Sequence, residues 1–347
     1  MPLARDANPC IRGALQQIRG MLTRRAVIGA FAGFAVAAPS AAQPRVPSVG
    51  FVALAARESH ARDMAALRAG LREIGHVEGQ TIAIAERYAD GDIALAERQT
   101  RDLMQSPPAV FLAAGPAAAR TILRVTRSIP IVALGLHPRG GQSDLFESLA
   151  RPGGMVTGFS NFGEELAARR VQLLKEVMPQ LKSVGVLHNA ADPVYRHWGE
   201  ETAAEVKAQG LAALQLPLTS ASAEALSGTL RAAQSRAVEA VIVVRDFLSV
   251  ALRREIARSC LEFRLAAIAE DRTFPDSGAL MSYGASDVDM FRRSAAYLDK
   301  IIRGQVVAEL PVQLPTKFEL VANLKTAKAI GLAVPESILI RADELVE

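Results

Sequence analysis

Ser48-Val-Gly-Phe-Val-Ala-Leu54 is a short apolar run, and residues 63–74 follow it with apolar side chains at helical spacing. The first segment has the β-branched and aromatic content of a buried strand. The second carries Met64 and Leu67 on one face, and Gly75 is a stop signal for a helix. This strand-then-helix order recurs along the chain, so it decides the class of fold.

Strand-like and helix-like segments alternate from residue 48 to about 270. Further strands are predicted at 81–86, 109–114, 129–134, 183–187, 240–244 and 266–269, with a late one at 279–283. Further helices are predicted at 93–104, 117–126, 164–178, 195–209, 251–263 and 287–303. Nearly continuous apolar strands between amphipathic helices are typical of parallel sheets covered on both faces. The series runs twice, which predicts an α/β fold of two doubly wound parallel-sheet lobes.

The first 42 residues predict a cleaved export signal. Arg24-Arg25 precedes an apolar run at 26–38, and Pro39-Ser-Ala-Ala42 is a small-residue cleavage pattern. The apolar run is too short to span a bilayer. We therefore expect a soluble periplasmic product, cut near Ala42, with no membrane insertion after cleavage. The arginine pair suits the twin-arginine (Tat) route and the Sec route about equally.

Charge and cysteine content narrow the classes of partner. The 347-residue chain has a formal net charge of +4, but five arginines and one aspartate within residues 1–42 account for all of it. A neutral remainder gives no footprint for nucleic acid. Cys10 lies in the signal segment and Cys260 is alone, so the mature chain has no internal disulfide. We expect Cys260 to be a small buried hydrophobe.

Motifs for cofactor chemistry are absent from the sequence. It has no Gly-x-Gly-x-x-Gly after a strand, no Walker lysine motif, no His-Glu-x-x-His and no paired CxxC. The segment 158–163 misses the Gly-x-Ser-x-Gly nucleophile elbow by one residue. We expect no cofactor, no metal and no enzyme activity. An exported α/β hydrolase is the less favoured alternative.

The C-terminal fifty-odd residues carry a resemblance to a known family. The segments are Gly278-Ala-Leu-Met-Ser-Tyr-Gly284, Asp299-Lys-Ile-Ile-Arg-Gly304, Leu310-Pro-Val-Gln-Leu-Pro-Thr-Lys-Phe-Glu-Leu-Val-Ala-Asn323, Leu324-Lys-Thr-Ala-Lys-Ala-Ile-Gly331 and Arg341-Ala-Asp343. Earlier pieces, Gly75-His-Val-Glu-Gly79 and Ser148-Leu-Ala-Arg-Pro-Gly-Gly154 among them, occur in the same order. The chain resembles the ABC-transporter substrate-binding proteins related to the tryptophan and aromatic amino-acid binders.

The resemblance implies the type I periplasmic-binding fold, with two lobes, three crossings and a ligand cleft at the hinge. The implied first lobe is 43–158 plus 279–308, and the second is 159–278 plus 309–347. The Pro/Gly-rich turn at 149–158 marks the first crossing. The implied function is capture of a small solute, amino-acid-like or an aromatic carboxylate, for an inner-membrane permease, by a monomer. A ligand sensor for a membrane receptor is the alternative with the same fold.

Candidate ligand contacts follow from the rule that open α/β sheets bind ligands beyond the carboxyl ends of their strands. They are Arg57, Gly115, Ala117, Ala118, His137, Phe162, His188, Asn189, Tyr195, Asp246, Asp271 and Tyr283. The family commonly has Asp-Pro-Val where this chain reads Leu136-His-Pro-Arg139. We interpret that basic lip as suited to a carboxylate.

Roles for an amino-acid-like ligand can be assigned from side-chain chemistry. Helix-start amides at Ala117 and Ala118 would hold a carboxylate, and Asp246 or Asp271 would pair with an ammonium group. Packing against an apolar or aromatic ligand side chain would fall to Tyr195, Phe162 and Tyr283. Core packing at a strand end is the more usual role of a residue such as Tyr283, and His188 is equally a candidate for a hydrogen-bonded loop residue.

Overall fold

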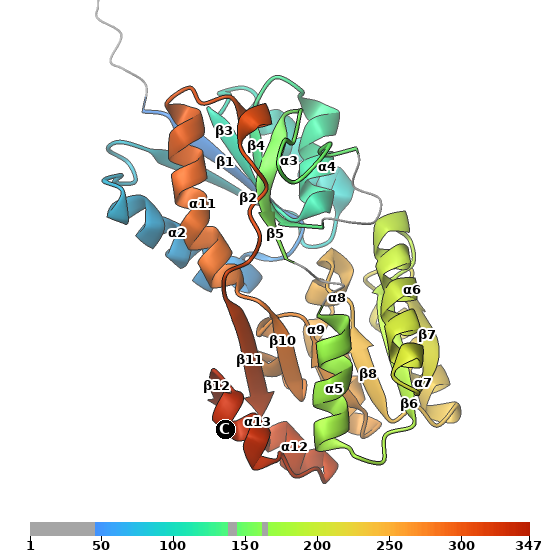
Figure 1. Cartoon of the computed structure of the whole chain (residues 1–347). Coiled ribbons are helices and arrows are strands. Elements are labelled where there is room, and N and C mark those ends of the chain that lie inside the picture. The colour runs from blue at the N-terminus through green and yellow to red at the C-terminus, as the bar shows by residue number, and fades with distance from the viewer. Residues whose placement is uncertain (1–45, 138–143, 162–165) are drawn as a thin grey trace, which may run out of the picture. The chain divides into compact units, whose positions relative to one another are not determined.

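Two β-sheets organise the described residues, 46–137, 144–161 and 166–347, of the computed structural model (Figure 1). One sheet has five strands in the order β2-β1-β3-β4-β5, and the other has seven in the order β12-β11-β10-β9-β8-β6-β7. We call each sheet with its helices the first and the second lobe. Parallel sheets in two lobes confirm the predicted α/β class. The predicted export signal lies outside the described residues.

The first sheet is parallel throughout. Its strands are β1 (Ser48–Ala53), β2 (Ala83–Tyr88), β3 (Val110–Ala114), β4 (Ile131–Leu136) and β5 (Val156–Ser160). Its helices are η2 (Arg57–His60), α2 (Ala61–Glu73), α3 (Ile93–Leu103), α4 (Pro116–Val125) and α11 (Asp287–Ile302), with η3 (Val307–Glu309) beside β5. Phe51 and Val52 are fully buried in separate core clusters, because neighbouring strand residues face opposite sides of the sheet.

The second sheet is parallel except where β10 meets β11. Its strands are β6 (Ser183–Asn189), β7 (Ala212–Leu218), β8 (Ala240–Val243), β9 (Ala266–Ala269), β10 (Met281–Ala285), β11 (Phe318–Asn323) and β12 (Glu344–Val346). Its helices are α5 (Ala167–Val177), α6 (Pro193–Ala208), α7 (Ala223–Ser235), α8 (Phe247–Ala251), α9 (Arg253–Glu262), α10 (Thr273–Asp276), α12 (Leu324–Ile330) and α13 (Glu336–Arg341).

Helix α11 comes late in the chain but packs beside α2 in the first lobe (Figure 1). A Cβ atom at Gly70 would lie 2.2 Å from the carbonyl oxygen of Arg292, so only glycine permits this close approach. Apolar side chains of α11, including Phe291 and Leu298, are buried there. Ser286 starts the helix by accepting a hydrogen bond from the amide of Asp289.

The structure corrects the lobe boundaries expected from the sequence. The strand predicted at 279–283 for the first lobe is β10, and it pairs with β9 and β11 in the second sheet. Conversely, Leu310 and Val312 are still buried in first-lobe clusters, and Gln313 forms a bridge with Phe159. Hydrophobic periodicity identifies a buried strand, but it does not say which sheet the strand joins.

A further expectation concerns Cys260. Cys260 is 2% exposed in a core cluster of the second lobe, and burial raises the pKa of its thiol to about 12, as expected of a small buried hydrophobe. None of the helices in the described segments combines the length and apolar character that crossing a membrane requires.

Candidate functional site

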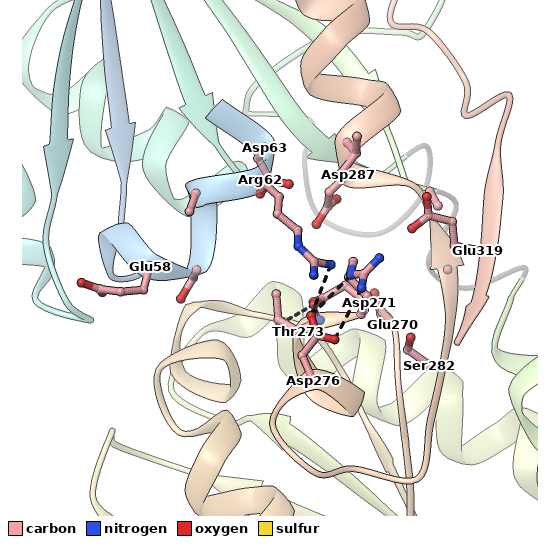
Figure 2. Close-up of a pocket in the computed structure, with 16 residues that line it drawn as sticks. Glu58, Arg62, Asp63, Glu270, Asp271, Thr273, Asp276, Ser282, Asp287 and Glu319 are labelled. Carbon is pink, nitrogen blue, oxygen red and sulfur yellow. Dashed lines mark hydrogen bonds and ion pairs between the residues drawn. The ribbon is translucent and has the colours of Figure 1, made fainter. Parts of the chain in front are cut away.

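A cavity of about 200 Å³ lies among residues of both lobes (Figure 2). We call it the acidic chamber. Glu58 and Asp63 line it from the first lobe, Asp271 lines it from the loop after β9, and Asp287 lines it from the start of α11. In the close-up, Asp63 and Asp287 lie across the space from Glu270 and Asp271. The cavity therefore lies where the carboxyl ends of parallel strands meet.

A smaller cavity of about 40 Å³ adjoins this region, and we call it the aromatic chamber. The start of α4 lines it from the first lobe with Gly115 and Ala117, while Tyr195 and Trp198 line it from α6. A third, narrow space shares Arg245 with the aromatic chamber and several residues with the acidic chamber. The third space therefore lies between the two chambers, and we call the three together the cleft.

Arg245 connects carboxylates of the two lobes. Its Nε lies 2.6 Å from Oδ2 of Asp271 in the second lobe, and its Nη2 lies 2.9 Å from Oδ2 of Asp287 at the start of α11. One guanidinium therefore serves two carboxylates. Burial, together with the charges of Asp63 and Asp271, raises the pKa of Asp287 to about 7 although Arg245 lies beside it.

Negative charge dominates the acidic chamber. Its lining includes seven acidic residues, Glu58, Asp63, Glu270, Asp271, Asp276, Asp287 and Glu319. The two arginines of the lining are already engaged: Arg62 lies 3.5 Å from Asp276, and Arg272 lies 2.7 Å from Glu344. Figure 2 shows Arg62 reaching from the first lobe toward Asp276. In the described part of the chain, no group of three or more His, Cys, Asp or Glu side chains could hold a metal ion. The excess of carboxylates in the chamber favours a positively charged group.

Asp246 lines the aromatic chamber, but its carboxylate is bound within the protein. One oxygen accepts the amide of Ser249 at 2.8 Å and the other accepts Nδ2 of Asn189 at 2.6 Å. It forms a capping box at the start of α8. Burial raises the pKa of Asp246 above its usual range, against these hydrogen bonds. Asp271 is bound within the protein too, because its Oδ2 accepts Nε of Arg245 at 2.6 Å and its Oδ1 accepts the amide of Thr273 at 2.8 Å, so these bonds do not separate the two predicted partners for an ammonium group.

Replacing Asp246 with alanine is expected to lower the free energy of unfolding by about 2–4 kcal/mol, because the helix loses its cap and the Asn189 amide is left buried without an acceptor. Chemical denaturation would measure the loss. Asp192→Ala is the matched control, since Asp192 caps α6 through Val194 without a buried partner of this kind, and it should cost about 1 kcal/mol. Equal losses in the two variants would contradict this role for Asp246.

The structure brings some predicted contacts together in the cleft. Gly115, Ala117, Tyr195 and Asp246 line the aromatic chamber, and Asp271 lines the acidic chamber. His137 is buried with its ring 4.7 Å from that of Trp198, which places it behind the chamber wall. Asn189 stands behind Asp246 and holds it. That these residues contact a ligand stays a prediction.

Other predicted contacts lie away from the cleft. Arg57 is exposed, paired with Glu86 and stacked over the Tyr88 ring at 4.6 Å. His188 is buried with Nδ1 3.2 Å from the carbonyl oxygen of Val186, and burial lowers the pKa of its ring. Ala118 is fully buried in a first-lobe cluster, Tyr283 packs on the second-lobe core, and Phe162 lies outside the described residues.

The predicted contacts do not include Asp63, Trp198, Arg245 or Asp287. Arg245 stands beside Asp246 just after β8, so the rule of strand ends selects it too. Asp63 and Asp287 stand in the first turns of α2 and α11, where acidic residues are ordinary helix-start signals. Nothing in their local sequence says that the two helices meet at one cavity.

A two-lobed fold with a cleft at the strand ends is typical of solute-binding proteins. The chain belongs to the family described as ABC transporter substrate binding protein, which it matches over residues 48–346. Members of this family bind small-molecule ligands and work with ABC transporter permeases. They are not an enzyme family and are typically exported.

Individual relatives are distant in sequence. A tyrosine-binding protein of Clostridioides difficile (strain R20291) is 20% identical over 264 residues, which is 76% of this chain and 74% of that protein. Among solved structures, the ABC domain in complex with L-Trp from Streptococcus pneumonia has a TM-score of 0.78 at 21% identity, covering 86% of this chain and 99% of that one. A conserved domain protein from Vibrio cholerae has the same TM-score and identity, covering 87% and 100%. These likenesses support the fold.

Proposed function

We propose that the protein captures an amino-acid-like solute in the periplasm and presents it to its permease. The observation that carries this proposal is the pairing of two unlike chambers in one cleft. The acidic chamber, at Asp271 and Asp287, suits an ammonium group. The aromatic chamber, at the N-terminus of α4, suits a carboxylate.

The chemistry of the walls supports a zwitterion over a sugar. The cleft brings charges of both signs together around Arg245, which suits a solute that carries both an ammonium group and a carboxylate. A tyrosine-binding relative and a relative solved with L-Trp support the same ligand class. Tyr195, Trp198 and Phe247 in the aromatic chamber also suit a simple aromatic carboxylate.

Closure of the lobes is the proposed mechanism of capture. A solute that contacts both lobes offsets the cost of bringing them together. Arg245–Asp287 and Arg62–Asp276 already join the lobes as ion pairs. The proposed mature protein is a monomer that begins after Ala42, freed from its export signal by cleavage.

A thermal-shift screen of the purified protein tests the ligand class. Bound solute is first removed by unfolding and refolding, and the panel is L-tryptophan, L-tyrosine, L-phenylalanine, L-lysine, benzoate, glucose and adenine. A solute at ~100 times its Kd should stabilise the fold by about 2.7 kcal/mol. We expect a shift with at least one amino acid and none with glucose. A shift with glucose or adenine alone would overturn the proposed ligand class.

A further inference from the structure

Arg245 has its backbone fixed on both sides. The amide of Val244 donates to the carbonyl oxygen of Leu187 at 2.9 Å, which continues the pairing of β8 with β6 as far as that residue. Asp246, the residue after Arg245, caps α8. Arg245 is therefore anchored where a strand ends and a helix begins, at the edge of the sheet where ligands bind.

Two aspartates hold the guanidinium group of Arg245. Its Nε donates to Oδ2 of Asp271 at 2.6 Å, and its Nη2 lies 2.9 Å from Oδ2 of Asp287. Asp271 is fixed in turn, because its Oδ1 accepts the amide of Thr273 at 2.8 Å. Since a guanidinium group is planar, contacts at two of its nitrogen atoms set the direction of the third.

Nη1 is the third nitrogen, and it is left for another partner. It makes no hydrogen bond with a described residue, and it is not fully enclosed. The side chain of Arg245 is 24% exposed. Arg245 lines the aromatic chamber and the third space, whereas Asp271 and Asp287 line the acidic chamber and the third space. The aspartates therefore hold the guanidinium from the acidic side, which leaves Nη1 toward the aromatic chamber.

Arg245 stays charged in this position. Burial opposes its charge, but Asp287 and Asp271 raise the pKa of the guanidinium above its usual range. Apolar residues such as Leu54 and Val250 also line the aromatic chamber. An anion that enters such surroundings needs a positive partner, because an unpaired buried charge is costly. Arg245 can be that partner on the side of the second lobe.

The balance of charge selects the kind of solute. Arg245, Asp271 and Asp287 together carry one positive and two negative charges when Asp287 is ionised. A carboxylate alone would add a third negative charge beside them, which is unfavourable. A solute that also carries an ammonium group brings its own positive charge to Asp287, so the total charge does not change. Arg245 then shares its charge with the carboxylate of the solute.

We propose that Nη1 of Arg245 binds the carboxylate of the solute in the aromatic chamber, while Asp287, the ion-pair partner of Arg245, binds the ammonium group. Each charge of the zwitterion thus pairs with one member of the Arg245–Asp287 ion pair. This inference rests on the proposed function and deepens it, since both charges must lie on one solute. Arg245 then determines specificity for amino acids over amines and over simple aromatic carboxylates.

Matched solutes separate the two charges. Each set contains an amino acid, its amine without the carboxylate and its acid without the α-ammonium group. The sets are L-tryptophan, tryptamine and 3-indolepropanoate; L-tyrosine, tyramine and 3-(4-hydroxyphenyl)propanoate; L-phenylalanine, phenethylamine and 3-phenylpropanoate; and L-lysine, cadaverine and 6-aminohexanoate. Calorimetry at pH 8 measures the affinities. For the wild type we expect the amine and the acid each to bind at least about 10-fold more weakly than the amino acid. An acid that binds as tightly as its amino acid would overturn the proposal.

Arg245→Lys tests the residue itself. Lysine keeps a positive charge near Asp271 and Asp287, but it lacks the planar fork that presents Nη1 to a further partner. We expect the variant to bind the amino acid about 10-fold to 100-fold more weakly than the wild type. The amine should lose less than about threefold, since it makes no contact with Nη1. Equal losses for the amino acid and the amine would overturn the proposal.

Arg62→Lys is the matched control. Arg62 makes another ion pair between the lobes, 3.5 Å from Asp276, and it lines the acidic chamber. The control makes the same chemical change away from the aromatic chamber, so it should change the affinities of amino acid and amine by the same factor. Failure of all four amino acids to bind the wild type would overturn the proposed ligand class and this inference together. Binding without a carboxylate-dependent loss in Arg245→Lys would overturn this inference alone.

A crystal structure of the wild type with a bound amino acid tests the contact without a variant. We expect a carboxylate oxygen of the solute at about 2.7–2.9 Å from Nη1 of Arg245, the usual length of such a charged hydrogen bond. The ammonium group should lie beside Asp287. A carboxylate bound away from Arg245 would overturn the proposal even if Arg245→Lys does not fold.

Discussion

Asp287→Asn is expected to bind amino acids at least about 100-fold more weakly than the wild type, while its fold is more stable than that of the wild type at pH 8. The substitution keeps the shape of the side chain and removes its charge. Removing one partner of a buried charge pair typically costs 2–5 kcal/mol of binding. Arg245 still has Asp271 as a partner at 2.6 Å, so its own charge stays compensated.

Stability should move in the opposite direction to affinity. The pKa of Asp287 in the fold is about 7, above that of an unfolded aspartate, so ionising it opposes folding. The protonated carboxyl of Asp287 makes its full contribution to stability below the pKa of an unfolded aspartate. This contribution is lost as pH rises through 7. Asparagine removes that cost at pH 8. Calorimetric titration and thermal melts of the same samples would measure both effects.

Asp289→Asn is the matched control for this variant. Asp289 lies on the same helix, pairs with Arg293 at 3.3 Å and does not line the cleft. It should leave affinity within about threefold of the wild type, since surface ion pairs contribute little. If Asp289→Asn weakened binding as much as Asp287→Asn, the effect would lie in the helix and not in the chamber.

The sequence predicted the fold because its strands are buried on both faces and therefore read as apolar runs. β9 occupies the predicted residues 266–269. By contrast, β7 and α7 had no prediction, since β7 is an edge strand with exposed alternating positions and contains Pro217. Edge strands bury less apolar surface, so their signal in the sequence is weaker.

The candidate site was predictable only in part for a geometric reason. Residues at a strand end, such as Gly115 in the first lobe and Asp271 in the second, can be predicted to line a cleft from the parallel sheet of their own lobe alone. Asp63 and Asp287 reach the cleft because α11 packs on α2 after more than two hundred intervening residues. Only a three-dimensional arrangement shows that these acidic groups face Asp271 from the other lobe.

The affinity for an amino acid is expected to rise with pH up to about 7. The ammonium group of the solute requires ionised Asp287, and the pKa of Asp287 is about 7 in the cleft. Below that pH, the ionised fraction of Asp287 falls about tenfold for each pH unit. Binding at pH 5 should therefore be about 100-fold weaker than at pH 8. Calorimetric titrations from pH 5 to pH 8 would measure the profile.

Asp287→Asn tests whether this titration belongs to Asp287. The variant should bind weakly at every pH, because asparagine has no negative charge to pair with the ammonium group. Its affinity should not change with pH, because it has no proton to lose. Without solute, the same group acts in the opposite sense: its contribution to the stability of the fold falls as pH rises toward 7. Bound solute should cancel that fall, since an ammonium group beside Asp287 lowers its pKa again. A wild-type affinity that does not change between pH 5 and pH 8 would exclude Asp287 as the ammonium partner.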